Sequence, residues 1–119
     1  MEPTPRQVEI DIKTDAYIPA DYVEDEKQRV ALYRRLNLVA SEKELLELKE
    51  EIVDRFGRLP APLLRLLEVL TVKVEAQDKG IKSIRERDSE IRIEWFSGRI
   101  SSLKLKGRNK IAELRSLIG

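Results

Sequence analysis

The chain has 119 residues, which fits one domain with a modest core and is too short for a motor fold plus a partner module. Its 23 lysines and arginines balance its 22 aspartates and glutamates, so its overall charge gives no general attraction to nucleic acid or to an acidic membrane. Cysteine and histidine are absent, which excludes disulfides, thiolate nucleophiles, the commonest zinc ligands and the usual general base at neutral pH.

The N-terminal residues predict a boundary, a strand and a loop. Residues 1–7 are polar and rich in proline, which is typical of a linker or a domain boundary and unlike a signal peptide. Val8, Ile10 and Ile12 alternate with charged residues, so they predict a strand with one buried face. Residues 16–22 place two tyrosines around a proline, and we expect an ordered, non-helical loop that its aromatic side chains hold in place.

Residues 24–40 predict a first helix with one apolar side. The side chains that we expect on that side are Val30, Leu32, Tyr33, Leu36, Val39 and Ala40. Arg29 projects into the same arc, where an unpaired buried charge would cost about 3–5 kcal/mol. We therefore expect a carboxylate or carbonyl partner for Arg29, and an internal ion pair is the interpretation we favour.

A second helix is predicted to follow directly, because Ser41 and Glu44 have the spacing of a capping box. Its apolar stripe consists of Leu45, Leu48, Ile52 and Phe56. The opposite side carries the acidic residues Glu44, Glu47, Glu50, Glu51 and Asp54. Gly57 is expected to end the helix.

Residues 60–79 predict a third helix that begins near Pro60 and ends before Gly80. Leucines and valines cover most of its circumference, which is typical of a central core helix. Charged residues interrupt its apolar stretch at 65, 68 and 73, so we expect no membrane span and a cytoplasmic protein.

The remaining residues predict a small sheet and a closing helix. The apolar positions that alternate as in strands are Ile81, Ile84, Ile91, Ile93, Trp95, Leu103 and Leu105, with turns at 88–89 and 97–98. Residues 109–118 have the helically spaced side chains Ile111, Leu114, Leu117 and Ile118. We expect an α+β fold, in which a three-helix N-terminal half packs on a small antiparallel sheet, with a C-terminal helix. The first strand would join that sheet, and the leucine-rich third helix would cover one face of it.

The candidate chemistry is confined to an acidic row and a basic hairpin, because the sequence contains neither a phosphate-binding glycine loop nor a dinucleotide fingerprint. The acidic row consists of Glu47, Glu50, Glu51 and Asp54. These carboxylates could serve a small enzyme in acid–base or Mg²⁺ chemistry, form a solvated helix face, or dock a basic partner. We favour the solvated or docking interpretations, because nothing in the sequence shows groups from other elements converging on the row.

The C-terminal half is locally cationic and could form a nucleic-acid surface. Its basic residues are Arg85, Arg87, Arg92, Arg99, Lys104, Lys106, Arg108 and Lys110. Strand alternation, however, predicts that Arg92 shares the outer face with Glu90 and Glu94 while Trp95 lies with the isoleucines. Stacking on bases would then require an exposed Phe96.

Three ordered segments resemble a known family: Ala16-Tyr17-Ile18-Pro19-x-x-Tyr22, Arg29-x-x-x-Tyr33-Arg34-Arg35-Leu36 and Asp54-Arg55-Phe56-Gly57-x-Leu59-Pro60. Their order and spacing resemble the C-terminal (TRCF) domain of bacterial transcription-repair coupling factor (Mfd). The similarity spans roughly residues 8–84, and only the general pattern supports it over the hairpin and the final helix.

The resemblance implies that residues 8–119 are a single regulatory interaction domain from a larger DNA-repair protein. The parent would be an ATP-dependent DNA translocase that displaces stalled RNA polymerase and recruits nucleotide-excision repair through UvrA. Its C-terminal domain would dock on a UvrB-like module of the same chain and mask the UvrA-binding surface until a stalled polymerase is engaged. ATP and magnesium would belong to the motor domains of the parent, and we expect no cofactor and no catalysis in this chain.

The docking surface that we expect is the acidic face of the second helix, flanked by Arg55 and Arg58, with Glu51 and Asp54 as the best pair. Electrostatic complementarity with a basic partner would set register and partner choice. Asp54 could instead bond Arg29 or Arg34 internally, in which case Glu47 and Glu51 would remain for the partner. The alternative function is a nucleic-acid-binding accessory domain that uses the basic hairpin.

Overall fold

The computed structural model describes residues 8–105 and 110–118, so the predicted boundary at 1–7 lies outside the described residues. Within these ranges the chain forms four helices and four strands, which confirms the predicted α+β fold with a C-terminal helix. The chain divides into two compact units, one made of Thr14–Val74 and the other of Met1–Lys13 together with Glu75–Gly119. That residues 8–119 act as one domain stays a prediction.

The first helix of the Thr14–Val74 unit, α1, spans Glu26–Asn37 and is shorter than predicted at both ends. The Asp25 side chain caps it by accepting a hydrogen bond from the Lys27 N–H. Leu32 and Leu36 are buried as expected, but Val30 is 45% exposed and Ala40 lies beyond the helix end. Val30 sits about 160° around the helix from Leu32, which places it on the solvent side.

Arg29 is held by the backbone rather than by a carboxylate. Its Nη1 donates to the carbonyl oxygen of Val23 at 2.9 Å, and Val23 itself is fully buried. The predicted internal ion pair is therefore wrong, although a carbonyl partner satisfies the guanidinium at the start of α1.

The second helix, α2, spans Glu42–Phe56 and begins at the predicted capping box. The Ser41 Oγ accepts from the Glu44 N–H at 3.2 Å, and the Glu44 carboxylate accepts from the Ala40 N–H at 2.9 Å. The helix ends at Gly57, whose φ of 96° is accessible to glycine and costly for other residues.

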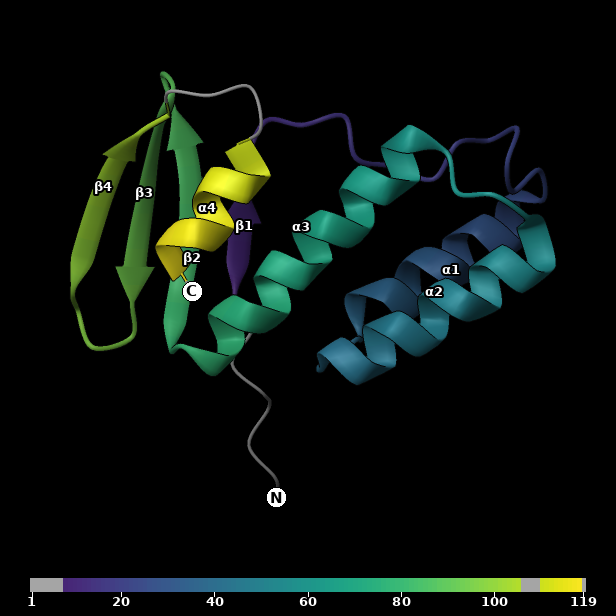
Figure 1. Cartoon of the computed structure of the whole chain (residues 1–119), viewed down its shortest axis with the longest axis horizontal. Helices are drawn as coiled ribbons and strands as arrows, with labels where there is room; N and C mark the ends of the chain where they lie inside the picture. The colour runs from purple at the N-terminus through teal and green to yellow at the C-terminus, as the bar shows by residue number, and fades with distance from the viewer. Residues whose placement is uncertain (1–7, 106–109, 119) are drawn as a thin grey trace. The chain divides into compact units, whose positions relative to one another are not determined.

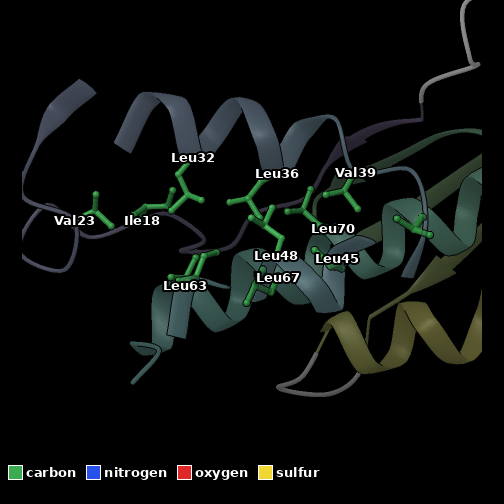
Figure 2. Packing of buried hydrophobic residues seen from close by; sticks show 12 residues of the cluster. Ile18, Val23, Leu32, Leu36, Val39, Leu45, Leu48, Leu63, Leu67 and Leu70 are labelled. Carbon is green, nitrogen blue, oxygen red and sulfur yellow. The ribbon is translucent and has the colours of Figure 1, made fainter. Parts of the chain in front are cut away.

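The third helix, α3, spans Ala61–Asp78, and its part up to Val74 completes the core of the Thr14–Val74 unit. Figure 2 shows side chains of α1, α2 and α3 converging there, with Leu36 and Leu48 pointing toward one another. The buried cluster consists of Ile18, Val23, Leu32, Leu36, Val39, Leu45, Leu48, Ile52, Leu63, Leu67, Leu70 and Val74. Phe56, predicted in the buried stripe, packs against this cluster while remaining partly exposed.

The loop before α1 is the first of the three segments that carry the family resemblance, and contacts with the other two segments hold it in place. The Tyr22 hydroxyl donates to the Gly57 carbonyl at 2.5 Å, and its ring lies 5.8 Å from the Phe56 ring. The Ile18 N–H donates to the Tyr33 hydroxyl oxygen at 2.7 Å. Tyr22 therefore holds the loop as expected, whereas the side chain of Tyr17 is exposed and Tyr33 of α1 supplies the second contact.

The other unit contains a sheet in the order β1-β2-β3-β4 (Figure 1). Its strands are β1 Glu9–Asp11, β2 Ile81–Arg87, β3 Glu90–Trp95 and β4 Ile100–Lys104. The last three form the predicted antiparallel meander, and β1 joins β2 in parallel, so the sheet is mixed. Parallel pairing needs a long connection, which the helical segment between β1 and β2 supplies.

Strand register gathers the isoleucines on one face of the sheet. Ile84 lies opposite Ile10 and Ile93, and Ile84, Ile91 and Ile93 are almost fully buried. The turn between β2 and β3 uses Asp88 and Ser89, both with positive φ, which is the requirement of a tight two-residue hairpin turn.

The last helix, α4, spans Lys110–Ile118 and lies beside the sheet in Figure 1. Ile111, Leu114 and Ile118 are buried as predicted, whereas Leu117 is exposed. The predicted cover of the sheet by the third helix stays a prediction. Across the described ranges, no helix is both long enough and apolar enough to span a membrane.

Candidate functional site

The acidic face of α2 forms as predicted and is open to solvent. Glu47, Glu50 and Asp54 are exposed and Glu51 is half-buried. At 100° per residue the four carboxylates fall within an arc of about 100°. The apolar stripe with Leu45, Leu48 and Ile52 faces the core on the other side, which orients the carboxylates outward.

Glu51 has an intramolecular partner that the sequence did not reveal. The Arg35 Nη1, on α1, lies 2.5 Å from the Glu51 Oε2, and both side chains are about half-exposed. An exposed pair of this kind contributes only about 0–1 kcal/mol to stability. Its main effect is to hold one carboxylate of the row in a defined position and partly neutralise it.

Asp54 does not form the internal ion pair that the sequence left open. Among the described residues, no lysine or arginine nitrogen lies within 4 Å of its carboxylate or of those of Glu47 and Glu50. These three carboxylates therefore leave a concentration of negative charge on α2 that nothing in the described chain neutralises.

The two flanking arginines are both exposed at the end of α2. The Arg55 guanidinium lies 5.1 Å from the centre of the Phe56 ring, a distance suited to a cation–π contact. Arg58 follows Gly57, beyond the end of the helix. The charge of the surface therefore changes sign where α2 ends.

A shallow groove borders the acidic face where α1 and α2 meet. Its volume is about 500 Å³, and its lining residues are Arg35, Leu38, Val39, Glu44, Glu47, Leu48 and Glu51. Leu38 is 74% exposed, and the sequence prediction did not include it, since it lies between Leu36 and Val39, which are both buried. A leucine between Leu36 and Val39 that breaks the helical spacing is the signal that could have found it.

This arrangement suits protein contact better than acid–base chemistry. The groove brings two carboxylates of the row beside an arginine and three apolar side chains, and it is open to solvent. No cluster of three or more His, Cys, Asp or Glu side chains in the described ranges could hold a metal ion.

The basic hairpin has the mixed-charge outer face that the strand alternation predicts. Arg92 lies on that face with Glu90 and Glu94, directly opposite Arg85 on β2. Arg85 pairs with Glu9 at 3.0 Å. The face lines a concavity of about 540 Å³ in which carboxylates alternate with the cations.

The aromatic residues of the hairpin are only partly available. The Arg99 guanidinium lies 4.7 Å from the centre of the Trp95 ring, whereas Phe96 is exposed, as stacking on bases would require. Two of the predicted cations, Lys106 and Arg108, lie outside the described residues. Nucleic-acid binding by the hairpin stays a prediction.

A further charge pair joins β2 and α4. The Lys110 Nζ donates to both Glu86 carboxylate oxygens at 2.8 and 3.0 Å and to the Lys13 carbonyl at 2.6 Å. Burial raises the pKa of Glu86, but the hydrogen bonds from Lys110 and the Lys13 N–H, with their positive charges, outweigh it. The pKa of Glu86 therefore lies below its ordinary value, and the pair is structural.

Comparison with known proteins identifies the family. The family model of the TRCF domain matches residues 12–105. The transcription-repair-coupling factor of Staphylococcus haemolyticus is 34% identical over 92 residues, which cover 77% of this chain and 8% of that protein. The corresponding protein of Staphylococcus aureus, strain USA300, is 32% identical over 87 residues, which cover 73% of this chain and 7% of that protein.

A solved structure agrees with these matches. The crystal structure of the C-terminal domain of transcription-repair coupling factor superposes with a TM-score of 0.71 at 28% identity, covering 75% of this chain and 55% of that one. The chain thus spans less than a tenth of the curated relatives that it matches. From its three ordered segments, its fold and these matches, the chain belongs to the TRCF-domain family, the C-terminal domain of transcription-repair coupling factors.

Proposed function

We propose that this chain is a regulatory clamp that docks through the acidic face of α2 on the UvrB-like module of its parent protein. Docking would mask the UvrA-binding surface of that module until the parent engages a stalled RNA polymerase on DNA. The chain itself would perform no catalysis in this cycle and bind no cofactor. ATP and magnesium would act in the motor domains of the parent, in the cytoplasm.

The observation that carries the proposal is the uncompensated charge of α2. Glu47, Glu50 and Asp54 project to solvent with no cationic partner among the described residues. They lie on the helix that ends in the Asp54-Arg55-Phe56-Gly57 segment of the family resemblance. A row of this kind favours a partner with lysines and arginines at matching spacing.

A polar, charged interface suits a clamp that must open. Two modules of one chain meet at high effective concentration, so a weak interface is enough to keep them closed. Charged rim contacts give fast association and selectivity with modest affinity, and they weaken with salt. Engagement of polymerase then needs to supply only a small free-energy difference to favour the open state.

The test is calorimetric titration of this chain into the UvrB-like module of the parent, with Glu50→Lys/Asp54→Lys in parallel. Glu51 is left unchanged because a lysine there would face Arg35 and disturb α1 and α2. We expect the double reversal to weaken binding by at least about tenfold, since each rim contact becomes repulsive.

The matched control is Asp21→Lys/Glu24→Lys, which changes the net charge equally at two exposed loop positions. Binding of the control should stay close to that of the unmodified chain, and circular dichroism should show intact helices in both variants. Absence of binding by the unmodified chain at millimolar concentration would overturn the proposal. Steep salt-dependent binding to DNA, lost on Arg92→Ala, would favour the nucleic-acid alternative.

A further inference from the structure

We infer that Leu38 is the apolar anchor of the docking surface, and that the partner surface offers an apolar patch flanked by basic side chains. The inference rests on the proposed function and deepens it, because it names the chemistry that the partner must have. If Leu38 is the anchor, the centre of the interface lies in the groove between α1 and α2, and not on the acidic face of α2 alone.

The exposure of Leu38 is the first observation. Its side chain is 74% exposed, more than any other large apolar side chain of the described ranges, while its neighbours Leu36 and Val39 are buried. An isolated exposed leucine needs no explanation by itself. This one lines the same groove as Glu47 and Glu51, so it belongs to a surface of defined composition.

The backbone holds Leu38 in place. It is the C-cap of α1, and its N–H donates to the carbonyls of Arg34 and Arg35 at 3.1 and 3.2 Å. The next N–H, of Val39, donates to the Leu36 carbonyl at 3.3 Å, and the Val39 side chain is buried in the core cluster. The backbone of Leu38 is therefore fixed, so only its side-chain rotamer has to be ordered on binding.

The lining of the groove identifies the kind of partner. Glu44, Glu47 and Glu51 line the groove together with the apolar side chains of Leu38, Val39 and Leu48. Arg35 is the single cation of this lining, and Glu51 already binds it. Apolar side chains beside charged ones are typical of a binding hot spot, and carboxylates in such a lining favour lysines and arginines on the partner.

The experiment is titration of the UvrB-like module with Leu38→Ser, at low and at high salt. The matched control is Leu64→Ser, an exposed leucine on α3 that lines a different groove. Burial of a leucine side chain in the interface predicts at least about tenfold weaker binding for Leu38→Ser. That ratio should persist at high salt, since salt screens the rim charges and leaves the apolar contact intact. Leu64→Ser should bind within about twofold of the unmodified chain.

The outcomes separate this inference from the proposed function. If the unmodified chain does not bind, the proposed function fails and the inference fails with it. If Glu50→Lys/Asp54→Lys weakens binding while Leu38→Ser matches Leu64→Ser, the acidic surface stands and the anchor is disproved. Weaker binding by Leu38→Ser than by Leu64→Ser, with helices intact by circular dichroism in both variants, supports the anchor.

Discussion

Glu86 shows how one side chain can make the fold sensitive to acid. Its side chain is only 7% exposed, and the Lys110 ammonium and the Lys13 N–H both donate to it. The charged form is therefore stabilised in the folded state, and its pKa lies below the ordinary value. A depressed carboxyl pKa contributes stability above the pKa of the unfolded chain, and that stability is lost as pH falls through the folded-state value.

We expect Glu86→Gln to lower the free energy of unfolding at pH 7 by about 1–3 kcal/mol, because it removes a buried charge-assisted bond. The difference from the unmodified chain should shrink in acid, as pH falls through the depressed folded-state pKa of Glu86 and the unmodified carboxylate also becomes neutral. Urea denaturation of both chains at pH 7 and at acid pH measures this difference in the free energy of unfolding. Glu9→Gln is the control, because its pair with Arg85 is exposed and worth at most about 1 kcal/mol. An equal loss of unfolding free energy at neutral and at acid pH would contradict the role of a charged Glu86.

At the scale of single residues, the sequence predicted side-chain periodicity well and partners poorly. The acidic row could be placed because its four members share one face of an uninterrupted helix. The Arg35–Glu51 pair could not, since it joins two helices whose rotation depends on how the core packs. Arg29 shows the same limit, because its partner is a backbone carbonyl in a loop.

At the scale of elements, local signals fixed where helices and turns begin. The capping box of Ser41 and Glu44 requires only residues three apart, and it forms as predicted. Parallel pairing of β1 with β2 depends on contacts more than seventy positions apart, as Glu9 and Ser83 illustrate, so no local pattern encodes it. Leu117 was wrongly predicted to be buried. The spacing of Ile111, Leu114, Leu117 and Ile118 in a nine-residue helix does not by itself show which of these large apolar side chains lies at the edge of the buried face.

The β2–β3 turn offers a test at this scale. Ser89 adopts a φ of 65°, a region that glycine enters without steric cost. We expect Ser89→Gly to raise the free energy of unfolding by about 0.5–1 kcal/mol, measured by thermal or urea denaturation. Ser97→Gly, in the β3–β4 turn, is the control, because positive φ there belongs to Gly98. Equal effects of the two substitutions would mean that backbone strain at Ser89 contributes nothing.

At the scale of the whole molecule, the three segments that carry the family resemblance contact one another in the folded chain. Tyr22 of the first segment contacts Phe56 and Gly57 of the third, and Ile18 of the first bonds Tyr33 of the second. Their ordered spacing is thus explained by mutual packing. The residues of the proposed docking surface are exposed on this framework and take no part in its core, which is why the fold could be predicted more fully than the site.

The framework and the proposed docking surface both belong to the Thr14–Val74 unit, which leads to a last prediction. Every member of the buried cluster lies between Ile18 and Val74, and the acidic row, its flanking arginines and Leu38 fall within the same unit. We therefore expect a fragment of residues 14–79, which keeps α3 whole, to show helical circular dichroism and cooperative unfolding.

This fragment should bind the UvrB-like module within about threefold of the whole chain, a difference of less than about 1 kcal/mol. The complementary fragment of residues 80–119 serves as the negative control and should not bind. Cooperative unfolding of the 14–79 fragment without binding would mean that the sheet unit supplies necessary contacts. The outer face of β2 and β3 around Arg92 would then become the surface to test, because it holds a concavity of about 540 Å³ lined by charged side chains.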